Sequence, residues 1–179
     1  IMGALACKVV ATDAGIPVIE HCSVSGTLTV NNTTYVPTGE NTDIEMNYAG
    51  IVAQSQGAHI KNCESNVAIT VNQVAVEGNT AKLRPYVGGI VGNAYGATLT
   101  EGITFTEVID CVNNGDILYK DVCCKADNLV ICPAVGGIAG GVQHYTTITK
   151  DDCVTHTQFT NCKNYGAVTI QANGGGSNS

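Results

Sequence analysis

The side chains best suited to chemistry in this chain are its nine cysteines. Four of them recur in one short pattern, apolar-x-polar-Cys-x-x-x-Gly-x-apolar; they are Cys22, Cys63, Cys111 and Cys162. A thiolate can act as a nucleophile or as a metal ligand, and either role needs a base or further ligands nearby. The spacings lack the paired CxxC of a zinc site, and the four histidines show no ligand spacing. Only Cys22 follows a histidine, and consecutive strand residues point to opposite faces, so we expect no catalytic cysteine.

Carboxylates offer a second chemistry. Asp151 and Asp152, together with Glu107 and Asp110, would supply a glycosidase pair or the oxygen ligands of a calcium site. A lyase acting on acidic sugars also needs cationic groups, and the chain has only eight Lys and Arg residues in total. The sequence therefore predicts a non-enzymatic protein without catalytic residue, metal or cofactor. A carbohydrate-binding or carbohydrate-cleaving domain is the alternative.

Composition favours strands and turns. Of 179 residues, 21 are Gly, 13% are charged and 5% are aromatic, with no Trp. The formal net charge of −7 argues against a nucleic-acid partner, because the basic patch that neutralises phosphates is absent. The longest uncharged apolar run, residues 129–142, is too short to span a membrane. The first residue is Ile1 rather than Met, which indicates a processed or excised piece.

A glycine motif precedes each copy of the cysteine pattern. It reads IMGALA, YAGIVA, VGGIVG and VGGIAG, and its aligned glycines are Gly3, Gly50, Gly89 and Gly137. The alternation in GTLTV and GAVTI is typical of strands, and tandem units of about 40 to 50 residues indicate a solenoid. We predict one all-β domain over residues 1–173, a short parallel β-helix of about four coils with inserted loops. Its repeats cover about 1–47, 48–86, 87–134 and 135–173, and a flexible tail follows at 174–179.

Stacking of coils gives each motif a structural role. Ile51, Ile90 and Ile138, with Ala4 in the first copy, are expected to form one apolar column, and the four aligned cysteines another. The polar residue before each cysteine and the glycine after it are expected to mark a tight turn, in which glycine supplies the positive φ. The glycines of GGIVG are expected to pack a sharp corner of the core rather than to cradle a phosphate.

Five cysteines lie outside the repeated pattern, and three of them fall on the inserted segment of residues 120–133. Disulfide candidates are Cys7, Cys123, Cys124, Cys132 and Cys153. Cys132 could close a short loop with either Cys123 or Cys124, and an odd number leaves at least one thiol free or paired with another chain. Overlapping sequons predict N-glycosylation acceptors at Asn31 and Asn32. The cysteine content favours an extracellular or cell-surface location.

The stretch GGIVGNAYGATL followed by VIDCVNNGDI resembles the GLUG-motif repeats of large bacterial and protist surface proteins. The resemblance covers all four units and is best in the third and fourth. It implies a right-handed β-solenoid, extracellular display and a mostly non-enzymatic stalk or adhesive role.

The expected partners are copies of the chain or neighbouring repeats of a longer one, because no capping segment stands at either end of the predicted stack. Head-to-tail association would give a fibre. Surface glycans or proteins are further expected partners, with Tyr95 and Tyr145 as candidate aromatic contacts or, equally, as covers of the coil edges.

Overall fold

The computed structural model describes residues 1–34, 43–75, 82–122, 130–131, 133–143 and 157–173. Regular structure in these residues is entirely β, without a helix, which confirms the all-β prediction. The strands are β1 (Met2–Gly3), β2 (Ala6–Val10), β3 (Val18–Glu20), β4 (Ser23–Thr34), β5 (Asp43–Ala49), β6 (Val52–Gln56), β7 (His59–Lys61), β8 (Glu64–Ala75), β9 (Lys82–Gly88), β10 (Val91–Leu99), β11 (Gly102–Phe105), β12 (Glu107–Ile109), β13 (Val112–Asn113), β14 (Ile117–Val122), β15 (Val130–Ile131), β16 (Ala134–Gly136), β17 (Ala139–Gln143), β18 (Gln158–Thr160), β19 (Lys163–Asn164) and β20 (Val168–Asn173).

These strands form four sheets. Sheet A contains β1, β5, β9, β15 and β16; sheet B contains β2, β6, β10, β17 and the hairpin strand β11; sheet C contains β3, β7, β12 and β18; sheet D contains β4, β8, β13, β14, β19 and β20. We call the consecutive sets β1–β4, β5–β8, β9–β14 and β15–β20 tiers 1 to 4. Neighbouring tiers pair in parallel in every sheet, and the β10–β11 hairpin is antiparallel.

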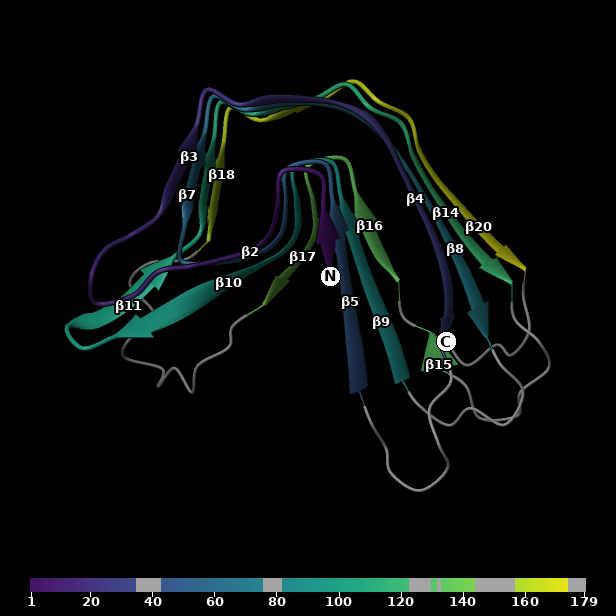
Figure 1. The fold of residues 1–179 in the computed structure, drawn as a ribbon, viewed down its shortest axis with the longest axis horizontal. Helices are drawn as coiled ribbons and strands as arrows, with labels where there is room; N and C mark the ends of the chain where they lie inside the picture. The colour runs from purple at the N-terminus through teal and green to yellow at the C-terminus, as the bar shows by residue number, and fades with distance from the viewer. Residues whose placement is uncertain (35–42, 76–81, 123–129, 132, 144–156, 174–179) are drawn as a thin grey trace.

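The four sheets form two walls of an arch (Figure 1). Sheets C and D make the outer wall, and sheets A and B make the inner wall and meet at a glycine-rich corner. One core cluster lies between sheets A and D, including Tyr48, Val71 and Leu83; a second lies between sheets B and C, including Ile51, Ile60 and Ile90. Alternation along each strand explains this division, because every second side chain faces the opposite wall.

The corner glycines pack against the outer wall. A Cβ atom on Gly137 would lie 2.2 Å from Cγ of Asn164, and one on Gly89 would lie 2.3 Å from Cγ of Asn113. On Gly50 it would lie 2.0 Å from Oγ of Ser65. Only glycine therefore lets the inner corner reach the polar column of sheet D, and these three glycines serve close packing.

Tier 1 differs from the predicted alignment by one residue. Gly3 pairs with Ala49, not with Gly50, so Ala4 takes the position of Gly50. Leu5, rather than Ala4, then stands at the start of the column of Ile51 and Ile90. The reason is local, because a Cβ atom on Gly3 would lie 2.0 Å from the carbonyl oxygen of Ala6.

Gly3 shares that constraint with two later glycines. A Cβ atom on Gly88 would lie 1.9 Å from the oxygen of Val91, and one on Gly136 would lie 2.1 Å from the oxygen of Ala139. At each of these positions the absence of a side chain lets the corner fold back, so that the glycine lies against the carbonyl oxygen of the residue three positions later. The predicted alignment therefore grouped Gly3 with glycines that have a different structural role.

The turn before each cysteine also differs from the prediction. The residues with positive φ there are His21, Asn62, Asp110 and Asn161, at φ values between 51° and 54°. Asn, Asp and His are the non-glycine residues that enter this left-handed region most readily, which explains all four identities. Gly26 does have a positive φ, of 137°. Gly115 and Gly166 are needed for another reason: a Cβ atom on either would lie 2.0 Å from a carbonyl oxygen of the preceding tier.

Candidate functional site

The four aligned cysteines lie in one column across the tiers. Ser23 pairs with Glu64, Glu64 with Val112, and Val112 with Lys163, which places the preceding cysteines in register. Cys63 and Cys111 are buried in the two central tiers, whereas Cys22 and Cys162 in the outer tiers are partly exposed. The column therefore crosses the second core cluster from one end of the stack to the other.

Each thiol of the column lies within hydrogen-bond distance of a carbonyl oxygen two residues earlier. The Sγ–O distances are 3.4 Å from Cys22 to Glu20, 3.2 Å from Cys63 to Lys61, 3.3 Å from Cys111 to Ile109 and 3.5 Å from Cys162 to Thr160. The left-handed residue between donor and acceptor turns this carbonyl toward the sulfur. Cys63, Cys111 and Cys162 also have an acceptor in the preceding tier, a carbonyl oxygen at 3.6, 3.5 and 3.3 Å respectively, so each of these protons can reach two carbonyls.

The protonation of the column follows from burial and from thiol–thiol contact. Burial raises the pKa of the Cys22 and Cys162 thiols. A hydrogen bond between the Cys63 and Cys111 side chains lowers the pKa of Cys63 and raises the pKa of Cys111. A thiol whose pKa is raised is a weak nucleophile at neutral pH.

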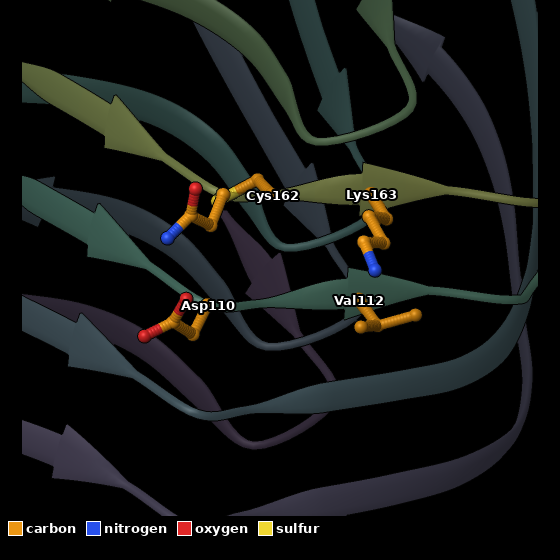
Figure 2. A pocket seen from close by; sticks show the side chains of 5 residues that line it. Asp110, Val112, Cys162 and Lys163 are labelled. Carbon is orange, nitrogen blue, oxygen red and sulfur yellow. The ribbon is translucent and has the colours of Figure 1, made fainter.

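A shallow hollow lies over the tier 4 end of this column. It has a volume of about 460 Å³ and is lined by Asp110, Val112, Asn161, Cys162 and Lys163. Figure 2 shows that the Lys163 side chain points toward Val112 on the neighbouring strand, and that Asp110 extends away from both. The hollow thus joins one carboxylate, one amine and a thiol of raised pKa, which is not the arrangement of a nucleophile with its base.

The predicted carboxylates are only partly described. Glu107 lies on the outer face of sheet C, with its Oε2 atom 3.6 Å from Nε2 of His59 and 3.8 Å from Nζ of Lys61. Asp110 occupies the left-handed turn. Asp151 and Asp152 lie outside the described residues. In the described ranges, no three His, Cys, Asp or Glu side chains are grouped so that they could hold a metal ion.

Tyr95, a candidate sugar contact, is fully buried. Its hydroxyl donates to the Glu45 carboxylate and accepts a 2.6 Å hydrogen bond from Nδ2 of Asn93. This network ties β10 to β5 across the inner face of the arch, and Gln143 and Tyr86 link β17 to β9 in the same way. Tyr95 is therefore structural, and Tyr145 lies outside the described residues.

This inner network could not be inferred from the repeat, because its members differ from tier to tier within their columns. Tyr95 shares its column with Val10, Gln56 and Gln143, so its aromatic hydroxyl does not recur there. Only the interspersed polar residues of β5 and β10 could have indicated a polar interface.

The two sequon asparagines face opposite sides of β4. Asn31 is exposed on the outer face of sheet D, where its Oδ1 accepts a 2.8 Å hydrogen bond from Asn72. The Asn32 amide points inward and donates to Oε1 of Gln73 at 2.9 Å. Asn31 is thus the accessible acceptor of the two.

The disulfide candidates are described only at Cys7, which is an exposed free thiol. Cys123, Cys124, Cys132 and Cys153 lie outside the described residues. The cysteines that the structure describes, namely Cys7 and the four of the column, are all free.

No membrane-crossing helix of sufficient length and apolar character occurs in the described part of the chain. Comparison with family models, with curated proteins and with solved structures finds no match to this chain.

Proposed function

We propose that this chain is a right-handed parallel β-helix of about four coils that serves as an extracellular structural or adhesive module. The observation that carries the proposal is the register of the tiers. In sheet D, β4 pairs with β8 over twelve residues without a break, from Ser23 opposite Glu64 to Thr34 opposite Ala75. The same parallel pairing recurs from tier to tier in all four sheets.

Such a stack is suited to a structural role because each tier contacts only its neighbours. Stability then grows by addition of tiers, and the length of the rod follows from their number. Inward columns such as Leu28, Ile69, Ile117 and Val168 supply the core, while outward columns are free to vary. The resemblance to GLUG-motif repeats supports the same role.

The outer face of sheet D supports an adhesive role. It presents polar side chains in rows, such as Thr29 beside Thr70 and Asn31 beside Asn72. A flat lattice of hydroxyl and amide groups can form many hydrogen bonds with a glycan or protein surface at a low cost in side-chain entropy. The exposed sequon at Asn31 lies on this face and supports an extracellular location.

Deleting one tier tests the structural part of the proposal. Removal of residues 48–86 joins Asn47 to Val87, and because Asn47 pairs with Tyr86 the chain re-enters the next tier in register. We expect this variant to unfold cooperatively in a denaturant titration followed by circular dichroism. The control is an out-of-phase deletion of equal length, residues 68–106, which should not fold. Loss of folding in both deletions would contradict the proposal.

Binding arrays test the adhesive part. We expect the protein to bind a glycan or an extracellular-matrix protein without releasing reducing ends. A Thr70→Glu substitution on sheet D should weaken this binding, whereas Glu107→Gln on the outer face of sheet C should leave it unchanged. Release of reducing ends would favour the carbohydrate-cleaving alternative.

A further inference from the structure

The two ends of the stack expose side chains from columns that are buried in its middle. Leu5 is 46% exposed in tier 1, although Ile51 and Ile90 in the same column are fully buried. Ile170 is 50% exposed in tier 4, although Val71 and Tyr119 in its column are fully buried. Each end is therefore a cross-section through the core, with apolar columns open to solvent.

We propose that these ends bind each other between copies of this chain, with tier 4 of one copy packed on tier 1 of the next. The proposal rests on the β-helix of the proposed function and names its partner, a second copy. The interface is heterologous, because the surface on tier 4 differs from the surface on tier 1.

The columns continue across such an interface with apolar residues on both sides. Ile170 would meet Val30 of the next copy, Val168 would meet Leu28, and Phe159 would meet Ile19. The tier-to-tier pairings fix these partners, since Ile170, Tyr119, Val71 and Val30 already share one column. Ala4 of the next copy would lie next to Gly137 in the same column, so a small residue would still occupy the corner where the two walls are close.

The backbone supplies a second match. At each internal junction the left-handed turn residue donates its N–H to the next tier: His21 to Lys61 at 3.1 Å, Asn62 to Ile109 at 3.0 Å and Asp110 to Thr160 at 2.9 Å. By the same rule, Asn161 would donate to the Glu20 carbonyl of the next copy. Glu64, Val112 and Lys163 donate in return to the cysteine carbonyl of the tier before, so Ser23 of the next copy would donate to Cys162.

Strand direction favours head-to-tail docking over docking of like ends. All inter-tier pairs are parallel, and a head-to-tail copy continues them in the same register. Two like ends would meet with opposite strand directions or mismatched columns. Because the described strands of tiers 1 and 4 pair on one side only, each end carries unpaired backbone donors and acceptors that recruit a further strand.

Single charges at the two ends test the interface. Leu5→Lys blocks the tier 1 surface and Ile170→Lys blocks the tier 4 surface. We expect either change to weaken association at least about 100-fold, because it buries an unpaired charge. Thr29→Lys and Thr169→Lys are matched controls in the same tiers, since both residues are exposed on the outer face of sheet D. Sedimentation velocity should show concentration-dependent oligomers for the wild type and for both controls.

Mixing the two blocked variants distinguishes the geometry. Leu5→Lys keeps an intact tier 4 and Ile170→Lys keeps an intact tier 1, so an equimolar mixture should form dimers and nothing longer. A wild type that stays monomeric at every concentration, or a mixture that stays monomeric, would overturn the inference. Circular dichroism distinguishes failure of the two proposals. A wild type that is folded but monomeric would refute the docking and leave the structural module intact, whereas an in-phase deletion that does not fold would refute the module itself.

Discussion

At the scale of single residues, the glycine corner and the polar column of sheet D are complementary. Gly137 leaves room for Asn164, and Asn164 uses that room to donate to the Gly166 carbonyl at 2.8 Å. Tier 1 has Ala4 at the glycine position and Val24 at the polar position. The two positions therefore change together within the chain.

This complementarity predicts a non-additive pair of substitutions. Gly137→Ala should lower the free energy of unfolding by about 1–3 kcal/mol, because its Cβ atom would overlap Asn164. In an Asn164→Ala background the same change should cost much less. Urea titrations of the wild type, both single variants and the double variant measure the coupling. Additive effects would contradict direct packing of the Gly137 position against Asn164.

The thiol column predicts a pH dependence. Burial raises the pKa of the Cys162 thiol in the folded chain above its unfolded value of about 8.5. The resulting stabilisation is complete at pH values below the unfolded pKa, and it is lost as the pH rises through the folded pKa. The stability advantage of the wild type over Cys162→Ala should therefore shrink above that pH. Paired urea titrations at neutral and alkaline pH measure it, and subtraction removes the contribution of Tyr48, whose pKa burial also raises. A difference independent of pH would argue against a raised pKa at Cys162.

The sequons give a prediction at the same scale. Expression in a eukaryotic secretory pathway should add one glycan at Asn31, because only this amide is exposed. Asn31→Gln should abolish the mobility shift that a glycan-removing enzyme produces, and Asn32→Gln should preserve it, since either change leaves the other sequon intact. A glycan on Asn32 would mean that the face of β4 that carries Asn32 points to solvent, which would contradict the structure.

At the scale of elements, the repeated features of the sequence predicted the strands correctly. Prediction failed at positions where equivalent-looking residues have different local roles. Alternating residues and the recurring cysteine pattern predicted parallel strands, and parallel sheets are present. The first glycine was misaligned because Gly3 and Gly50 meet different steric constraints that a single letter cannot separate. The left-handed position before each cysteine could have been inferred from its Asn and Asp residues. The Glu45–Tyr95 contact could not, since it joins two different sheets, β5 of sheet A and β10 of sheet B.

The left-handed turn predicts unequal effects of two substitutions at one site. Asn62→Gly should leave the free energy of unfolding nearly unchanged, because glycine adopts a φ of 51° without strain. Asn62→Val should lower it by about 1–3 kcal/mol, because a β-branched residue is poorly tolerated there. The control is Asn72→Val on β8, where a β-branched residue suits the strand. Equal costs for both valine variants would contradict a special backbone conformation at Asn62.

At the scale of the whole molecule, the central tiers should be the most stable part. Ile60 and Val108 are fully buried between neighbours on both sides, whereas Phe159 in tier 4 is 39% exposed. In a stack with nearest-neighbour contacts, the end tiers open first because they lose only one interface. Amide hydrogen exchange in the monomeric Ile170→Lys variant should therefore be slowest in β7 and β12 and fastest in β3 and β18. Wild-type oligomers should protect β3 and β18 as well, since docking covers both ends. Uniform protection across the tiers of the monomeric variant would show that the molecule unfolds as one unit rather than from its ends.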